Sequence, residues 1–118
     1  MSKTRDRIRK AKDYRHKIVA IDEWDGVEIE ARSVDVATRD LVGSISEEAE
    51  PAELSHMQLE VIMRSCYDPE TGELVFDRET DAELLLGKSP AVIQRLWRTV
   101  TELSAITDEA HGEAEKNS

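Results

Sequence analysis

The chain has 118 residues, a length typical of one compact domain. Charged residues make up 36% of it and aromatic residues 4%, with a net charge of -10, so a large core rich in aromatic rings is excluded. No apolar run approaches the roughly 20 residues of a membrane helix, and the basic start is not followed by the apolar stretch of a secretion signal. We therefore expect a cytoplasmic protein with a modest core and no membrane partner.

The chain begins with a basic arm, residues 1–17. The arm holds eight Lys and Arg and two Asp, a net charge of +6, which leaves -16 for the remainder. It contains little apolar surface, so we expect it to be flexible, or helical only when docked. Its basic side chains, with Arg5, Arg7 and Arg9 as candidates for partner binding, could grip nucleic acid, the acidic face of a partner or another copy of the chain. They could equally be solvated.

A β-hairpin is predicted next, over residues 18–32. Residues 18–21 are a short, mainly β-branched run, and apolar and charged residues alternate over 27–32, which places the apolar side chains on one face. Asp25 and Gly26 tolerate positive φ and suit a two-residue turn, with Trp24 beside it.

Two helices are predicted in the middle of the chain. The first covers about residues 35–45 and is capped by Ser33 or Asp35. An acidic connection follows and leads to a second helix that begins at Pro51 and runs for about 15 residues. Its wide apolar surface predicts a core helix. Three residues on that surface are also candidates for partner binding: Leu59, Ile62 and Met63.

The last part of the chain alternates turns and helices. A turn at residues 68–73 leads to a short strand at 74–76. A brief helix over 79–86 then stops near a glycine, and Ser89 with Pro90 opens a last helix with apolar residues spaced through four turns. Trp97 on that helix is either core or exposed to the groove of a partner. The final segment, 108–118, is polar and is expected to be a flexible tail.

The sequence contains no recognisable catalytic or metal motif. It has no Ser-His-Asp order, no HExxH and no glycine-rich phosphate loop. His16, His56 and His111 are scattered, and a lone Cys66 forms neither an internal disulfide nor a thiolate metal site. Carboxylates over 68–77 lack the spacing of a calcium loop. We therefore expect no enzyme, no metal site and no cofactor, and interpret Cys66 as a small buried apolar residue.

The segments after the second predicted helix follow a distinctive order. The parts are Asp68 with Gly72, Leu74 with Phe76, Asp81 with Leu84 and Leu85, Lys88 with Ser89, and the helix through Leu96 to Leu103. In this order the segment CYDPETGELVFDRETDAELLLGKSPAVIQRLWRTVTELSAIT resembles the C-terminal half of tail assembly chaperones of long-tailed bacteriophages. The segment DEWDGVEIEARSVDVATRDLV resembles the N-terminal hairpin and following helix of that family. The resemblance covers about residues 18–107 and leaves the arm outside.

The resemblance implies a non-enzymatic protein that coats the tape-measure protein, keeps it soluble and recruits tail tube subunits around it. We accordingly expect one α+β domain over residues 18–107, mostly helical, with an N-terminal β-hairpin packed on three or four helices. We also expect a homo-oligomer along the tape-measure chain.

Two other functions remain open. A nucleic-acid-associated regulator or antitoxin would use the basic arm, but the charge of -16 on the remainder would repel DNA and no helix-turn-helix with basic recognition residues is evident. We therefore do not expect nucleic acid as a partner. An acidic DNA mimic that inhibits a nuclease or repressor would instead require an ordered row of carboxylates on one face.

Overall fold

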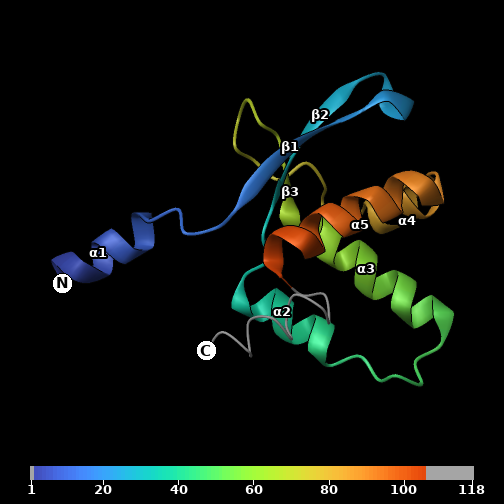
Figure 1. Ribbon diagram of the computed structural model, residues 1–118, viewed down its shortest axis with the longest axis horizontal. Coiled ribbons are helices and arrows are strands. Elements are labelled where there is room, and N and C mark those ends of the chain that lie inside the picture. Colours follow the sequence, from blue (N-terminus) through green and yellow to red (C-terminus); the bar gives the residue numbers. More distant parts are fainter. Residues whose placement is uncertain (1, 106–118) are drawn as a thin grey trace.

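The computed structural model describes residues 2–105, and the predicted tail at 108–118 lies outside them. The elements in chain order are α1 (Lys3–Lys10), β1 (His16–Ile21), a 3-10 turn (Asp22–Trp24), β2 (Val27–Arg32), α2 (Val36–Gly43), α3 (Pro51–Ser65), β3 (Cys66–Tyr67), α4 (Ala82–Leu86) and α5 (Pro90–Ser104) (Figure 1). The strands form one antiparallel sheet in the order β1-β2-β3. This mixture of a hairpin and packed helices confirms the predicted α+β class.

β1 and β2 form the predicted hairpin, in a register that pairs Ile21 with Val27 at the turn. Asp25 and Gly26 have φ angles of 57° and 73°, so both use the positive φ that the sequence indicated. The predicted two-residue turn is wrong, because the chain passes through the 3-10 turn first. The N–H of Gly26 donates to the carbonyl of Ile21 at 3.0 Å and closes this longer loop. The longer loop allows Trp24 to pack against the core.

The third strand, β3, lies where the sequence predicted only the end of a helix. α3 ends at Ser65, and the chain continues directly into two residues that pair with β2. The predicted strand at 74–76 is reduced to a single bridge between Tyr67 and Leu74. The third strand of the sheet is therefore formed by the two residues that follow α3, and not by the residues that follow the turn at 68–73.

The core lies between the sheet and the two long helices, α3 and α5. Along β2, Ile29 and Ala31 are buried while the residues between and beside them are more exposed, which confirms the predicted alternation. One stripe of α5, made of Val92, Leu96 and Val100, is fully buried. Its spacing of four residues places these side chains on one face of the helix, as predicted.

Local hydrogen bonds fix the ends of the shorter helices. The carboxylate of Asp35 accepts from the N–H of Thr38 at 2.9 Å, so Asp35 rather than Ser33 caps α2. α4 begins at Ala82 instead of residue 79. The reason is that the side chain of Asp81 accepts from the N–H of Asp77 at 2.7 Å, which holds residues 77–81 in a turn.

The sequence predicted an arm that is flexible or helical only when docked, and part of the arm is helical in this structure. The arm contains helix α1, which is capped by Ser2 and has no residue buried against the rest of the described chain. The helix projects from the body (Figure 1). The folded domain begins before residue 18, because β1 starts at His16 and the N–H of Arg15 donates to the hydroxyl of Ser33 at 2.9 Å.

This boundary predicts different results for two deletions, measured with dilute protein. Removing residues 2–12 is expected to change the midpoint of thermal unfolding by less than about 2 °C, since no buried surface is lost. Removing residues 2–17 deletes the first strand pairs and should lower the midpoint by about 4–8 °C or more. Thermal scans by circular dichroism test both. A large loss in the shorter deletion would mean that α1 packs on the body.

Candidate partner-binding surfaces

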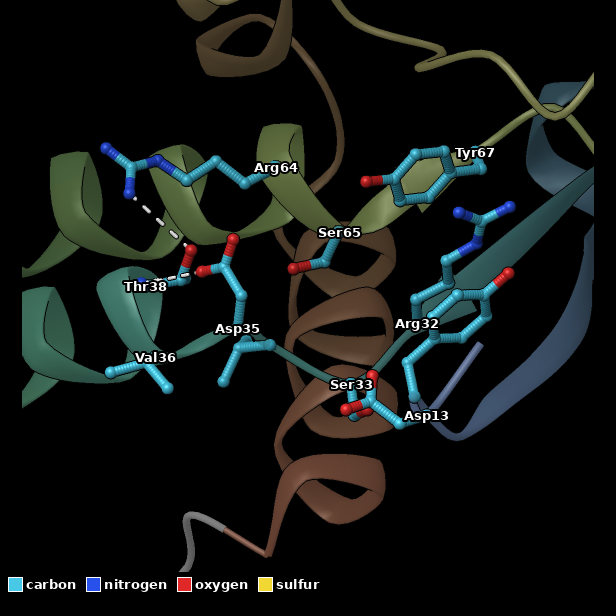
Figure 2. Close-up of a pocket in the computed structure, with 11 residues that line it drawn as sticks. Asp13, Arg32, Ser33, Asp35, Val36, Thr38, Arg64, Ser65 and Tyr67 are labelled. Carbon is cyan, nitrogen blue, oxygen red and sulfur yellow. Dashed lines mark hydrogen bonds between the residues drawn. The ribbon is translucent and has the colours of Figure 1, made fainter. Parts of the chain in front are cut away.

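A cavity of about 430 Å³ lies where the arm joins the body. Figure 2 shows its lining, which comes from the end of β2, the start of α2 and the end of α3. Arg32 and Arg64 bring positive charge to it, and Asp13 and Asp35 bring negative charge. The charges of the lining therefore balance, and the cavity favours neither an anionic nor a cationic ligand.

Arg32 is the centre of one side of this cavity. Its guanidinium carbon lies 4.4 Å from the ring centroid of Tyr14 and 3.7 Å from that of Tyr67. Its Nε donates to Glu30 at 2.6 Å. Cation–π attraction of this kind contributes about 0.5–2 kcal/mol per pair, depending on burial. Arg32 therefore joins the base of the arm to β3, and its guanidinium group already has partners within the chain.

The other side of the cavity is a hydrogen-bonded joint between α2 and α3. Arg64 donates from Nη1 to the hydroxyl of Thr38 at 3.5 Å and from Nε to Glu60 at 2.9 Å. Hydrogen bonding by Thr38, first through its side chain and then through its backbone, lowers the pKa of Asp35. These groups satisfy one another, so we interpret the cavity as a structural joint.

A second surface, which we call the leucine groove, lies between α3, α4 and α5. Its volume is about 170 Å³. The buried residues Leu59, Leu85 and Ile93 line it, together with Leu86, which is 55% exposed. Leu84 on the same short helix is 49% exposed but does not line the groove. Ser55, Gln58, Lys88 and Gln94 complete the lining with Pro90, so the leucine groove combines an apolar floor with a polar, partly basic rim.

The turn of the hairpin is fastened to α5 by an ion pair. Arg95 donates from Nη1 to Glu23 Oε1 at 3.0 Å and from Nη2 to Oε2 at 2.7 Å. The side-chain hydrogen bond from Arg95, followed by a backbone hydrogen bond, lowers the pKa of Glu23 from 4.5 to about 2. The side chains of Arg95 and Glu23 are 42% and 43% exposed, so this ion pair links the hairpin turn to α5 at the surface of the domain.

Residues 2–105 contain neither a cluster of metal-ligating side chains nor a membrane-spanning helix. Within that range no group of three or more His, Cys, Asp or Glu side chains is placed to hold a metal ion. No helix in the same part of the chain is long and apolar enough to cross a membrane. Cys66 is fully buried, and burial raises the pKa of its thiol to about 12. The interpretation of Cys66 as a small buried residue is thereby confirmed.

Comparison with known proteins identifies the fold. No protein-family model and no curated protein sequence match the chain. A solved structure does match it, that of the bacteriophage HK97 tail assembly chaperone, with a TM-score of 0.63 over 86% of this chain and 98% of that one. This chain has the fold of that chaperone. The two sequences are 21% identical, so the likeness establishes fold, and the predicted resemblance is confirmed at that level.

The chaperone-like fold uses the apolar candidates of α3 in its own core. Leu59, Ile62 and Met63 are 4%, 0% and 2% exposed. They pack with residues of the sheet and α5 in one cluster, so in this structure they are not exposed to a partner. The amphipathic pattern indicated a buried face correctly, but the buried face meets the sheet instead of a second protein.

The remaining candidates are far from one another within this chaperone-like fold. Trp97 is half-buried and packs against both core clusters of the described chain. Arg5, Arg7 and Arg9 are exposed on α1, which projects away from the body (Figure 1). The structure therefore does not gather the predicted residues into one site. The run of three leucines at 84–86 could have indicated an exposed apolar surface from the sequence, because a helix of little more than one turn cannot bury all three side chains.

The ion pair between Glu23 and Arg95 predicts a pH dependence. The folded pKa of Glu23, about 2, lies below the ordinary 4.5, so the pair stabilises the fold above about pH 4.5. That stabilisation is lost as the pH falls from about 4.5 to about 2. The difference in unfolding free energy between wild type and Glu23→Gln should therefore shrink over this interval in urea titrations.

A second substitution provides the control for that measurement. Arg95→Gln in the Glu23→Gln background should add no further pH dependence, because the partner carboxylate is already gone. If the difference in unfolding free energy between wild type and Glu23→Gln is the same at neutral and acidic pH, the ion pair does not stabilise the fold.

Proposed function

We propose that the protein is a phage tail assembly chaperone that acts without catalysis in the host cytoplasm. It binds the tape-measure protein during tail assembly and recruits tail tube subunits to it. The observation that carries this proposal is the match in fold to the HK97 tail assembly chaperone, which extends over 98% of that chain. The order of motifs in the sequence, which resembles the same family, supports it independently.

The surface chemistry supports a role in keeping an apolar partner soluble. Large apolar side chains are exposed on several elements, among them Ile18 on β1, Val36 on α2 and Leu74 in the turn region. The whole chain carries a net charge of -10. Scattered apolar contacts can cover the apolar face of a long helix, while a strong net charge keeps the complex from aggregating.

Co-expression with the tape-measure protein of the same phage tests this function. We expect the soluble share of the tape-measure protein to rise and the two chains to elute together in size-exclusion chromatography. An unrelated acidic protein of similar size and charge is the control, because it supplies charge without this fold. A tape-measure protein that stays insoluble, with no complex recovered, would overturn the proposal.

Recruitment of tail tube subunits is a separate step and needs its own measurement. The preformed complex of this chain with the tape-measure protein should retain purified tube protein on a column, whereas the tape-measure protein alone should retain less. Equal retention would remove recruitment from the proposed role while leaving tape-measure binding in place.

A further inference from the structure

The leucine groove fits one side chain of a partner protein better than a small molecule. Its volume is about 170 Å³, whereas sites for small molecules and cofactors usually enclose about 300–1,000 Å³. Its floor is closed, because Leu59, Leu85 and Ile93 belong to the main core cluster. Leu86, by contrast, is more than half exposed. One large apolar side chain of a partner would cover Leu86 and remove apolar surface from water.

The rim of the leucine groove carries no carboxylate, although the chain as a whole is acidic. The sequence has 26 acidic and 16 basic residues, yet Lys88 is the one charged residue of the lining. The cavity at the base of the arm has two carboxylates in its lining, and a depression beside Phe76 has three. At the leucine groove a carboxylate of a partner therefore meets an ammonium group instead of like charge.

Lys88 is not paired with a carboxylate inside the described chain. None of the ion pairs among residues 2–105 includes it, whereas Arg64, Arg78 and Arg95 each pair with a glutamate. Lys88 also lies just before α5, which begins at Pro90. The N-terminal end of a helix carries partial positive charge. Lys88 and the start of α5 therefore attract the same negative group.

The leucine groove is built from helices, which favours a helical partner. An extended peptide binds by pairing its backbone with a strand edge, and none of the elements around the groove is a strand. A helix satisfies its own backbone and needs only side-chain contacts. The rim offers such contacts. Gln94 Nε2 donates to Gln58 Oε1 at 3.3 Å, which leaves the Nε2 group of Gln58 able to donate.

We propose that the leucine groove holds an amphipathic helix of the tape-measure protein, which inserts one large apolar side chain beside Leu86 and presents a carboxylate to Lys88. A carboxylate three or four residues from the apolar anchor lies on the same face of the helix, so both contacts form together. The inference rests on the proposed function. It adds the surface at which the tape-measure protein is bound and the sequence signature of the bound segment.

The basic arm of the chain itself does not carry this signature. Ile8 is the large aliphatic residue of α1. The residues three and four positions from it are Thr4, Arg5, Ala11 and Lys12. The arm of a second copy would therefore bring positive charge to Lys88 and be repelled.

Two substitutions remove the two halves of the contact. Leu86→Asp replaces the exposed apolar residue of the lining with a charge, and Lys88→Glu reverses the charge of the rim. Leu84→Asp is the matched control for the first, since Leu84 is similarly exposed on the same helix but does not line the groove. Lys10→Glu is the control for the second, because it changes the net charge equally on α1, at the opposite end of the molecule from α4 (Figure 1). All four positions are exposed, so the fold is expected to survive, and circular dichroism verifies it.

Binding of the tape-measure protein is measured first with the full-length partner and then with peptides. Leu86→Asp should bind the full-length protein at least about tenfold more weakly than wild type, whereas Leu84→Asp and Lys10→Glu should match wild type. Overlapping peptides of about 25 residues, long enough to form a helix, then locate the bound segment by fluorescence anisotropy.

An exchange of charge tests the assignment of Lys88. The peptide that binds most tightly should carry Asp or Glu three or four residues from a large apolar residue. Replacing that acid with Lys should weaken binding to wild type about two- to fivefold and strengthen binding to Lys88→Glu. Both effects should shrink at high salt. A purely structural role of Lys88 would not invert the preference.

Each contrary result has a distinct meaning. If the tape-measure protein does not bind wild type at all, the proposed function is wrong and this inference falls with it. If it binds wild type and Leu86→Asp equally, the leucine groove is not the contact, although the proposed function stands. Bound peptides without the expected carboxylate, or a charge exchange without effect, would overturn the role of Lys88. Self-association of the purified chain in sedimentation velocity that Leu86→Asp abolishes would show that a second copy covers the groove instead.

Discussion

Leu96→Ala is expected to lower the free energy of unfolding by about 2–5 kcal/mol. Leu96 is 0% exposed and lies in the main core cluster with Ile21 and Ile62, so it joins α5 to the sheet and to α3. Truncation removes the transfer free energy of the lost atoms and leaves a cavity that the three elements cannot fully close. A loss of this size is a large share of the stability of a small domain.

The control for that prediction lies two residues away on the same helix. Arg98 is exposed, and Arg98→Ala should change the free energy of unfolding by less than about 0.5 kcal/mol. Arg95→Ala is not a suitable control because Arg95 is paired with Glu23. Urea unfolding followed by circular dichroism measures both variants. A cost for Leu96→Ala as small as that for Arg98→Ala would mean that the stripe of α5 is not packed.

The elements that the sequence predicted well are those with a long periodic signal. α5 is 15 residues long and repeats its apolar stripe over four turns, and β2 alternates along its length, so local periodicity sufficed for both. β3 has two residues and no periodicity of its own. It exists because the end of α3 delivers Cys66 and Tyr67 to the edge of the hairpin. The position of these two residues depends on tertiary packing between distant parts of the chain, which a local sequence pattern does not reveal.

The contacts of the candidate surfaces were harder to predict for the same reason. Arg95 and Glu23 are 72 residues apart, and Arg32 meets one aromatic ring from the arm and one from β3. The width of an apolar helix face also cannot distinguish a protein's own core from an interface. Ile62 therefore looked suitable for a partner but lies in the core, whereas the leucine groove arises only once three helices are packed together.

Trp97→Ala is expected to cost about 2–4 kcal/mol of unfolding free energy, since truncation of a large aromatic side chain is among the most damaging core changes. The sequence left Trp97 between a core role and a partner contact. The structure places the half-buried ring against both core clusters, between the residues around Leu96 and those around Val100. Loss of the ring should therefore loosen both clusters at once.

Trp97→Phe separates the two roles of the ring, because phenylalanine keeps most of the apolar contact and loses the indole edge. We expect it to fold with a smaller loss of stability. If the proposed function holds, Trp97→Phe should also co-purify with the tape-measure protein to the same extent as the wild type. Chemical unfolding followed by circular dichroism, together with co-purification of the tape-measure protein, gives both readouts. A folded Trp97→Phe that no longer co-purifies would assign the exposed edge of the ring to the partner, and a Trp97→Ala variant as stable as wild type would contradict its place in the core.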